Sequence, residues 1–94
     1  MRQEFEWDEN KAIANLRKHK VGFDEASTVF NDPFAITIPD PDHSIGEHRY
    51  LTLGESVNGK LLVVSHTNRQ DKIRIISCRK ATTSERKKYE DEEG

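Results

Sequence analysis

Asn58-Gly59 separates two stretches of alternating and β-branched residues, and no short sequence is a stronger signal of a hairpin turn. A two-residue type I′ turn needs a positive φ at both central positions, and Asn-Gly adopts it readily. The flanking stretches, residues 47–57 and 61–67, are therefore expected to pair as an antiparallel hairpin. A second turn at 69–72 leads into the apolar stretch 73–79, which predicts a three-stranded meander.

Helix signals flank this strand-forming region. Asp8 and Asp24 are suitable N-caps, each preceded by an aromatic residue, and they predict two helices before the strands. Thr82 opens a capping box, so a third helix is expected to follow, before an acidic tail from residue 90 that we expect to fray. With residues 34–38 as a fourth strand, we predict one α+β domain: two N-terminal helices, a four-stranded antiparallel meander and a C-terminal helix.

Composition excludes several classes of protein. The longest uninterrupted apolar stretch is 61–64, far short of the roughly 20 residues that cross a bilayer. The N-terminus lacks the apolar core of a secretory signal peptide. Cys78, the single cysteine, cannot form an internal disulfide, and the four histidines lack metal-ligand spacing. We therefore expect a cytoplasmic protein with no metal or other cofactor.

Charge is distributed unevenly along the chain. Residues 1–59 hold six Lys and Arg against eleven Asp and Glu, whereas residues 60–89 hold nine against two. A basic half on a small domain is typical of proteins that bind a polyanion. A charge-rich, solvated surface would give the same count, so charge alone leaves both interpretations open.

Arginines within the predicted strands are the main candidate functional residues. A turn centred on residues 70–71 pairs Arg74 with Thr67. That register places His66 and Arg79 on one face of the sheet and Arg74 on the other, unless a one-residue bulge shifts the alternation. The arginines serve either as structural ion pairs or as phosphate ligands, and their spacing does not decide between these roles.

RNA cleavage without a metal ion is one chemistry open to such residues. A base removes the proton of the ribose 2′-OH, a cation stabilises the charge on phosphorus, and an acid protonates the departing 5′ oxygen. Arginine suits the second role because its planar fork binds two phosphate oxygens. The side chains available to carry protons are Lys18, His19, Glu47, His48, His66 and Tyr89.

The order of residues along the chain points to a known family. The N-terminal motif is Phe5-x-Trp7-Asp8-x-x-Lys11-x-x-x-Asn15-Leu16-x-Lys18-His19-x-Val21-x-Phe23, followed by Ala26, Val29-Phe30 and Asp32-Pro33. The C-terminal motif is Arg74-Ile75-Ile76-Ser77-x-Arg79-Lys80-Ala81-Thr82, followed by Glu85-Arg86-x-x-Tyr89. With Glu47-x-Arg49 between them, these motifs resemble the BrnT family over residues 5–89. One departure is Lys20, where the family typically has Gly.

The resemblance implies a function. BrnT proteins are the toxins of bacterial type II toxin–antitoxin pairs; their fold is similar to that of RelE-like ribonucleases, and they inhibit translation by cutting RNA. The implied partners are an RNA substrate and a BrnA-type antitoxin, with operator DNA bound only through the antitoxin complex and no membrane involved.

On this hypothesis the catalytic candidates are His19, Glu47, Arg49, Arg74 and Arg79. The RNA-binding candidates are Lys18, Arg69, Lys80 and Tyr89. The alternative is a non-catalytic binding module that only binds its antitoxin or nucleic acid.

Overall fold

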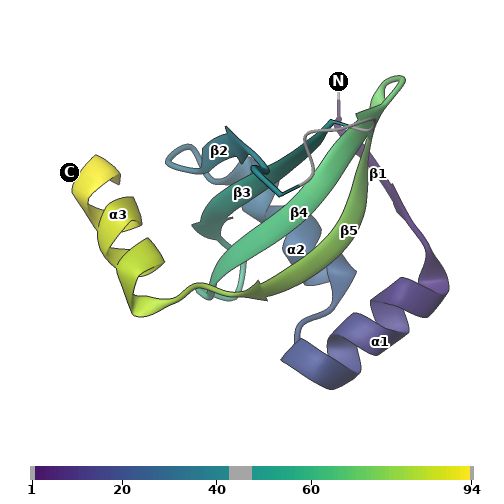
Figure 1. Cartoon of the computed structure of the whole chain (residues 1–94), viewed down its shortest axis with the longest axis horizontal. Coiled ribbons are helices and arrows are strands. Elements are labelled where there is room, and N and C mark those ends of the chain that lie inside the picture. The colour runs from purple at the N-terminus through teal and green to yellow at the C-terminus, as the bar shows by residue number, and fades with distance from the viewer. Residues whose placement is uncertain (1, 43–47, 94) are drawn as a thin grey trace.

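A five-stranded mixed sheet and three α-helices make up the computed structural model, which describes residues 2–42 and 48–93 (Figure 1). The elements are β1 (Glu4–Trp7), α1 (Glu9–His19), α2 (Phe23–Thr28), the 3-10 turn η1 (Val29–Asn31), β2 (Ile36–Pro39), β3 (Arg49–Glu55), β4 (Leu61–Arg69), β5 (Lys72–Lys80) and α3 (Thr83–Glu93). The strand order is β1-β5-β4-β3-β2. The predicted α+β class is confirmed, and α3 continues through most of the acidic tail.

Both predicted hairpins are present, but the first turn is longer than expected. Gly59 alone in that loop has a positive φ, of 79°, and Ser56 and Lys60 close the loop with a backbone hydrogen bond of 2.8 Å. This is the three-residue loop in which a left-handed glycine follows a tight turn, rather than a type I′ turn. The second turn is centred where predicted, because Arg69 pairs with Lys72.

The sheet has one strand more than the four that the sequence predicts. β1 pairs in parallel with β5, opposite Lys72 to Ile75, so the sheet is mixed rather than purely antiparallel. Its alternation sends Phe5 and Trp7 into the core, where the Trp7 ring meets the Phe23 ring edge-on at 5.9 Å between centroids. Four residues that pair with a strand far along the chain leave no turn signal nearby, and this is why the prediction missed β1.

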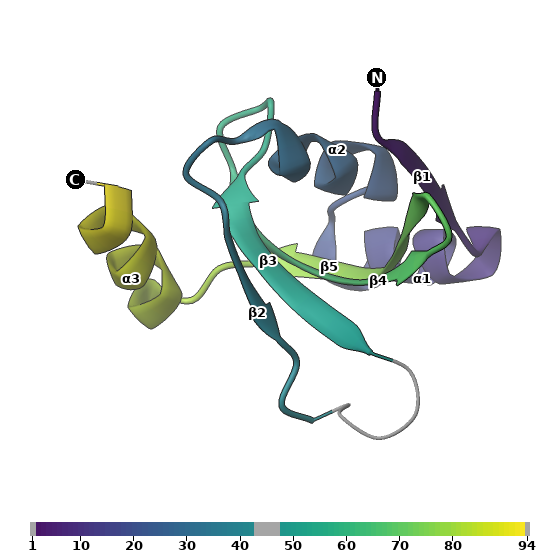
Figure 2. The same ribbon diagram turned by 90° about the horizontal axis from the view of Figure 1, so that it is seen from above.

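Helices α1 and α2 lie on the same side of the sheet, and α3 lies at the opposite end of the molecule from α1 (Figures 1 and 2). Beneath α1 and α2 the core is formed by Val21, Phe23, Ala26, Val29, Leu62, Val64, Ile75 and Cys78. We call this side the helical face, and the other side of the sheet the open face. On the open face, Tyr89 of α3 packs with Leu53, Leu61 and Val63.

Local signals explain how the helices begin, with one correction. The Asp8 side chain accepts a hydrogen bond from Asn10 N–H at 2.8 Å, as a cap should. Thr82 and Glu85 form the predicted reciprocal capping box. The second helix, however, is capped by Gly22 rather than Asp24, because Phe23 is drawn into the core as the first helical residue.

Two further features position the strands. Lys20 ends α1 in the left-handed conformation, with φ of 62°, at the place where the family typically has Gly. The buried Asn15 amide then ties α1 to β5: its Nδ2 donates to the carbonyl of Cys78 at 2.9 Å, and its Oδ1 accepts from Cys78 N–H at 3.0 Å.

No helix in the described ranges is long and apolar enough to cross a membrane.

Candidate nucleic-acid interface

Four cationic side chains share the open face at the end of the sheet that holds the β4–β5 turn. Arg49 is paired with Thr67 across β3 and β4, and Thr67 is paired with Arg74 across β4 and β5. Arg69 and Lys72 form the next pair on this face, beside the turn. Residues directly opposite each other in antiparallel strands project from the same face, so these side chains lie together. We call Arg49, Arg69, Lys72 and Arg74 the cationic cluster.

A one-residue bulge in β5 decides which face of the sheet Arg79 occupies. The β4–β5 register shifts between Ser65 and His66, and β5 carries one extra residue, Ile76, at that point. Arg74 therefore shares the open face with Arg79, and His66 takes the helical face. The predicted pairing of Arg74 with Thr67 is confirmed, and His66 and Arg74 lie on opposite faces as predicted. The expectation that Arg79 shares a face with His66 is wrong because of the bulge.

Arg74 is held by a carboxylate that the sequence analysis did not single out. Its Nη1 donates to Glu6 Oε2 at 3.0 Å, and both side chains are about 30% exposed. The parallel pairing of β1 with β5 places Glu6 directly opposite Arg74. A guanidinium has five N–H donors, so this ion pair fixes the side chain while leaving donors for a further anion. The signal that could have found Glu6 is the polar–apolar alternation of residues 4–7.

Thr67 organises the centre of the cluster. It is only 3% exposed, and its hydroxyl donates to the carbonyl of His48 at 2.6 Å, which fixes the start of β3. Arg49 follows His48 directly and makes no ion pair with a carboxylate in the described part of the chain. The Cα atoms of Arg49 and Arg74 are separated by two strand spacings, roughly 10 Å, a gap that one phosphate group can bridge through two long side chains.

Arg79 lies elsewhere on the open face and is occupied. Its Nη1 and Nη2 donate to the two carboxylate oxygens of Glu85 at 2.8 and 2.9 Å. This bidentate pair lowers the pKa of Glu85 to about 2. Arg79 is five residues beyond Arg74 on β5, roughly 15 Å away at the rise of a strand, so the structure does not bring the two together.

The remaining predicted residues are scattered. Lys18 and His19 end α1, which the Asn15 bonds fix over the opposite end of β5 from the cationic cluster. Lys80 is the exposed last residue of β5 at that same end. Tyr89 is 6% exposed, and its hydroxyl donates to Asp32 Oδ2 at 2.5 Å. Arg69 alone of the RNA-binding candidates joins the cluster, and Glu47 lies outside the described residues.

His66 is a buried core residue, whereas the sequence analysis included it among the possible proton carriers. It is buried on the helical face, where its ring stacks on Tyr50 and meets the edge of Phe30 at 4.8 Å between centroids. Burial lowers the pKa of His66 to about 4, so the imidazole is neutral at physiological pH. The Cys78 thiol is also buried, and its pKa is raised to about 12, which makes it an unreactive core group.

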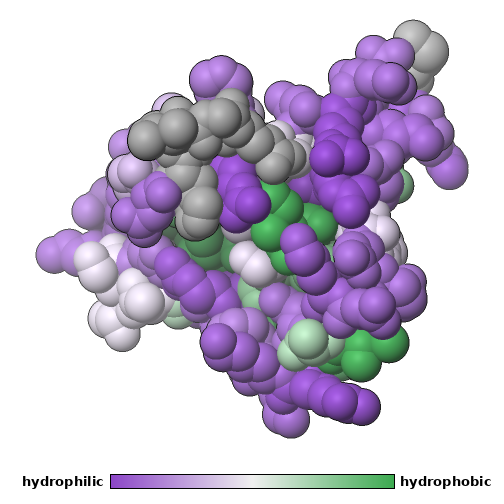
Figure 3. All heavy atoms as spheres, turned by 45° about the vertical axis from the view of Figure 1, so that its right-hand side comes forward, coloured by the Kyte–Doolittle hydropathy of each residue, from purple (hydrophilic) through white to green (hydrophobic). Residues whose placement is uncertain are grey.

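The arrangement suits a polyanion rather than a small molecule. The cluster combines the exposed Arg69 and Lys72 with the partly exposed Arg49 and Arg74 on one sheet face, and the Glu6 carboxylate is bound to Arg74. In the side of the molecule shown in Figure 3, hydrophobic residues reach the surface only in small areas between hydrophilic ones. Within the described ranges, no three His, Cys, Asp or Glu side chains gather in a way that could hold a metal ion.

Comparisons with known proteins agree on one family. A family model described as the ribonuclease toxin, BrnT, of type II toxin–antitoxin systems matches residues 7–85. No curated protein matches the chain significantly. The 1.1 Å crystal structure of the Brucella abortus ribonuclease toxin, BrnT, is similar in fold, with a TM-score of 0.67 and 21% sequence identity over 87% of this chain and 100% of that chain. This chain belongs to the BrnT family of ribonuclease toxins of type II toxin–antitoxin systems.

Proposed function

We propose that this toxin is a metal-independent endoribonuclease that binds RNA on the open face, with the scissile phosphate between Arg49 and Arg74. The observation that carries the proposal is the row Arg49–Thr67–Arg74, in which two guanidinium groups flank one hydroxyl-bearing residue on an exposed sheet face. Arg69 and Lys72 extend the positive charge toward the turn and would bind the neighbouring phosphates of the strand.

The chemistry follows from what the cluster offers. The ribose 2′-oxygen attacks the adjacent phosphorus, and the bond from phosphorus to the 5′ oxygen of the next nucleotide breaks, which leaves a 2′,3′-cyclic phosphate and a free 5′-hydroxyl. The guanidinium groups stabilise the additional negative charge on the phosphate oxygens. Glu6, which binds Arg74, is the proton carrier that the structure places in the row. His48, which precedes Arg49 in the chain, and Glu47 of the Glu47-x-Arg49 motif stay candidates.

Cleavage of RNA in this way would inhibit translation, and a type II toxin needs a protein that neutralises it. The family implies a cognate protein antitoxin. We propose that this partner is of the BrnA type and that operator DNA is bound only through the toxin–antitoxin complex. His19, Arg79, Lys18, Lys80 and Tyr89 remain predictions for roles in catalysis or RNA binding, although none of them lies in the cationic cluster.

A non-catalytic binding module is the competing function, and one observation favours it. Two of the three arginines predicted to act on phosphate already bind carboxylates, Arg74 with Glu6 and Arg79 with Glu85. If these pairs persist when RNA is present, the arginines are structural. The two functions differ in a single measurable property, which is whether RNA is cut.

The test is cleavage of a single-stranded RNA by the purified protein in the presence of EDTA. We expect cleavage with 2′,3′-cyclic phosphate ends, and a loss of roughly a hundredfold or more in rate for Arg49→Ala and Arg74→Ala. Arg17→Ala, which removes an exposed cation from α1, is the matched control and should cleave normally. Abolition of cleavage by EDTA, or full activity of both cluster variants, would refute the mechanism. Tight antitoxin binding by a wild-type protein that cuts no RNA would establish the binding module.

A further inference from the structure

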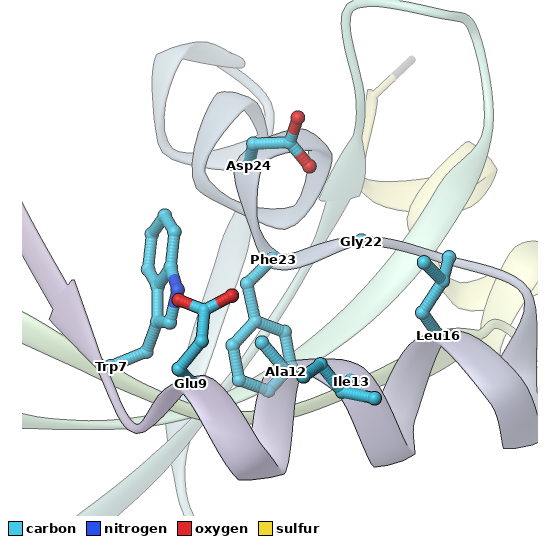
Figure 4. Close-up of a pocket in the computed structure, with 8 residues that line it drawn as sticks. All are labelled: Trp7, Glu9, Ala12, Ile13, Leu16, Gly22, Phe23 and Asp24. Carbon is cyan, nitrogen blue, oxygen red and sulfur yellow. The ribbon is translucent and has the colours of Figure 1, made fainter.

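A groove runs between α1 and the start of α2 (Figure 4). It lies on the helical side of the sheet, because Trp7 and Phe23 pack in the core there, whereas the cationic cluster is on the open face. Its volume is about 350 Å³, and Figure 4 shows the Phe23 ring pointing toward α1, with the Trp7 ring beside Glu9 at one end. Along α1, Ile13 and Leu16 border the groove and remain 46% and 52% exposed. Residues three apart on a helix are neighbours on one face, so these two side chains form a continuous apolar strip.

An apolar strip of this kind needs a partner that brings apolar side chains. In the free chain, Ile13 and Leu16 are exposed to water and do not belong to the core beneath α1. Burying these two side chains against apolar groups of a partner would contribute favourable free energy to binding. Contact with polar groups of a partner would not supply this contribution. The groove is therefore shaped for a protein segment that carries at least two apolar residues.

The charges at the groove select among partners. The two charged residues that line it, Glu9 and Asp24, are both acidic, and they open α1 and α2 respectively. A phosphate backbone would be repelled here. A second copy of this chain, in a symmetric pair, would set the same acidic border against itself. A segment that carries Lys or Arg next to its apolar residues could contact Ile13 and Leu16 and also pair with Glu9 and Asp24.

We propose that this groove docks a segment of the protein antitoxin, with two apolar side chains on Ile13 and Leu16 and one or more cationic side chains beside Glu9 and Asp24. The inference rests on the proposed function only in its choice of partner. Because α1 and α2 cover the helical face and the cationic cluster occupies the open face, the groove anchors the antitoxin without touching the RNA site. Neutralisation is then exerted by another part of the antitoxin.

The test measures binding of the purified cognate antitoxin to the full-length toxin by titration calorimetry. Leu16→Gln and Ile13→Gln should each weaken binding roughly tenfold or more, while the substituted residue keeps the helix favourable. Val57→Gln is the matched control, because Val57 is an exposed apolar residue of the β3–β4 loop, 76% exposed, and should bind as the wild type does.

A second arm tests the charges. Asp24→Asn should slow association and reduce its dependence on salt, whereas Asp91→Asn on α3 should change neither. Wild-type affinity in Leu16→Gln and Ile13→Gln would overturn the proposal. So would a dimer of the free wild-type chain that Leu16→Gln dissociates while antitoxin affinity stays unchanged.

The RNA assay separates this inference from the proposed function. The groove variants should cut RNA at the wild-type rate but need more antitoxin for inhibition, since the RNA site is on the other face. A wild-type chain that cuts no RNA, with groove variants that still lose antitoxin affinity, would refute the proposed cleavage and leave the docking site standing.

Discussion

The stability of this protein should depend on pH through one buried histidine. The Nε2 atom of His66 shares a hydrogen bond of 2.7 Å with the hydroxyl of Thr52, which in turn lies 2.8 Å from the hydroxyl of Thr37. The Nδ1 atom is buried and has no hydrogen-bond partner within the described part of the chain. Burial lowers the pKa of His66 from 6.5 to about 4, and no carboxylate among the described residues offsets this effect.

The sign and size of the effect follow from these two values. Between pH 6.5 and pH 4 the unfolded chain binds a proton at His66 that the folded protein does not, so acid favours unfolding. The free energy of unfolding should fall by up to about 1.4 kcal/mol per pH unit, and by about 2.5 kcal/mol in total between pH 7.5 and pH 4.5. Glu85, whose pKa is lowered from 4.5 to about 2, adds a loss of the same sign that falls mainly below pH 4.5.

Urea unfolding followed by Trp7 fluorescence at four pH values from 7.5 to 4.5 measures this dependence. The wild type should lose stability over the whole interval. His66→Gln should be less stable at pH 7.5 because it loses the ring contacts with Phe30 and Tyr50, but its stability should change little between pH 6.5 and 4.5. His48→Gln, which removes an exposed histidine, should keep the wild-type slope.

Two results would refute the reasoning. A wild-type stability that does not change between pH 6.5 and 4.5 would mean that the folded protein protonates His66 as easily as the unfolded chain does. A His66→Gln variant with the wild-type slope would assign the pH dependence to another group.

Two further predictions concern α1. Lys20→Gly should raise the free energy of unfolding by about 1 kcal/mol, because glycine adopts the left-handed C-terminal conformation without strain; thermal melting measures this, and Lys18→Gly within the helix should lower stability instead. Asn15→Leu should cost about 2–3 kcal/mol in urea unfolding, because it leaves the buried N–H and C=O of Cys78 without partners, whereas Asn10→Leu on the exposed side should cost little.

Local chemistry made much of the fold predictable. The turn after β4, the Asp8 cap and the Thr82 capping box each depend on a few neighbouring residues, and the structure confirms them. The turn after β3 is confirmed in position, although it is a three-residue loop and not a type I′ turn. The second cap failed because tertiary burial of Phe23 outweighed the preference of Asp24 for the cap position. Burial of this kind is a property of the assembled core and leaves no mark in the local sequence.

The site was predictable in its residue types and only partly in its arrangement. Arg49 and Arg74 belong to the family-like motifs, and the turn register correctly pairs Arg74 with Thr67. The face of Arg79 depends on a bulge at Ile76, inside a run of similar apolar residues where nothing marks an extra residue. Glu6 could not be placed opposite Arg74 because the parallel strand that carries it was not predicted. The choice between phosphate ligand and ion pair was left open for the arginines, and for Arg79 the structure adds a bidentate carboxylate.

The Asn15 amide has a consequence for how this sheet meets other chains. β1 covers the edge of β5 only as far as Ile75, and beyond it the Asn15 side chain offers Cys78 the donor and the acceptor that one more strand residue would provide. A strand edge with unpaired backbone groups can pair with a strand of another chain, which leads to aggregation or fibril growth. The Asn15 amide thus blocks strand addition to β5 beyond the end of β1, so the edges of the described sheet that remain are the short strand β1 and, on the other side, β2, which ends in Pro39.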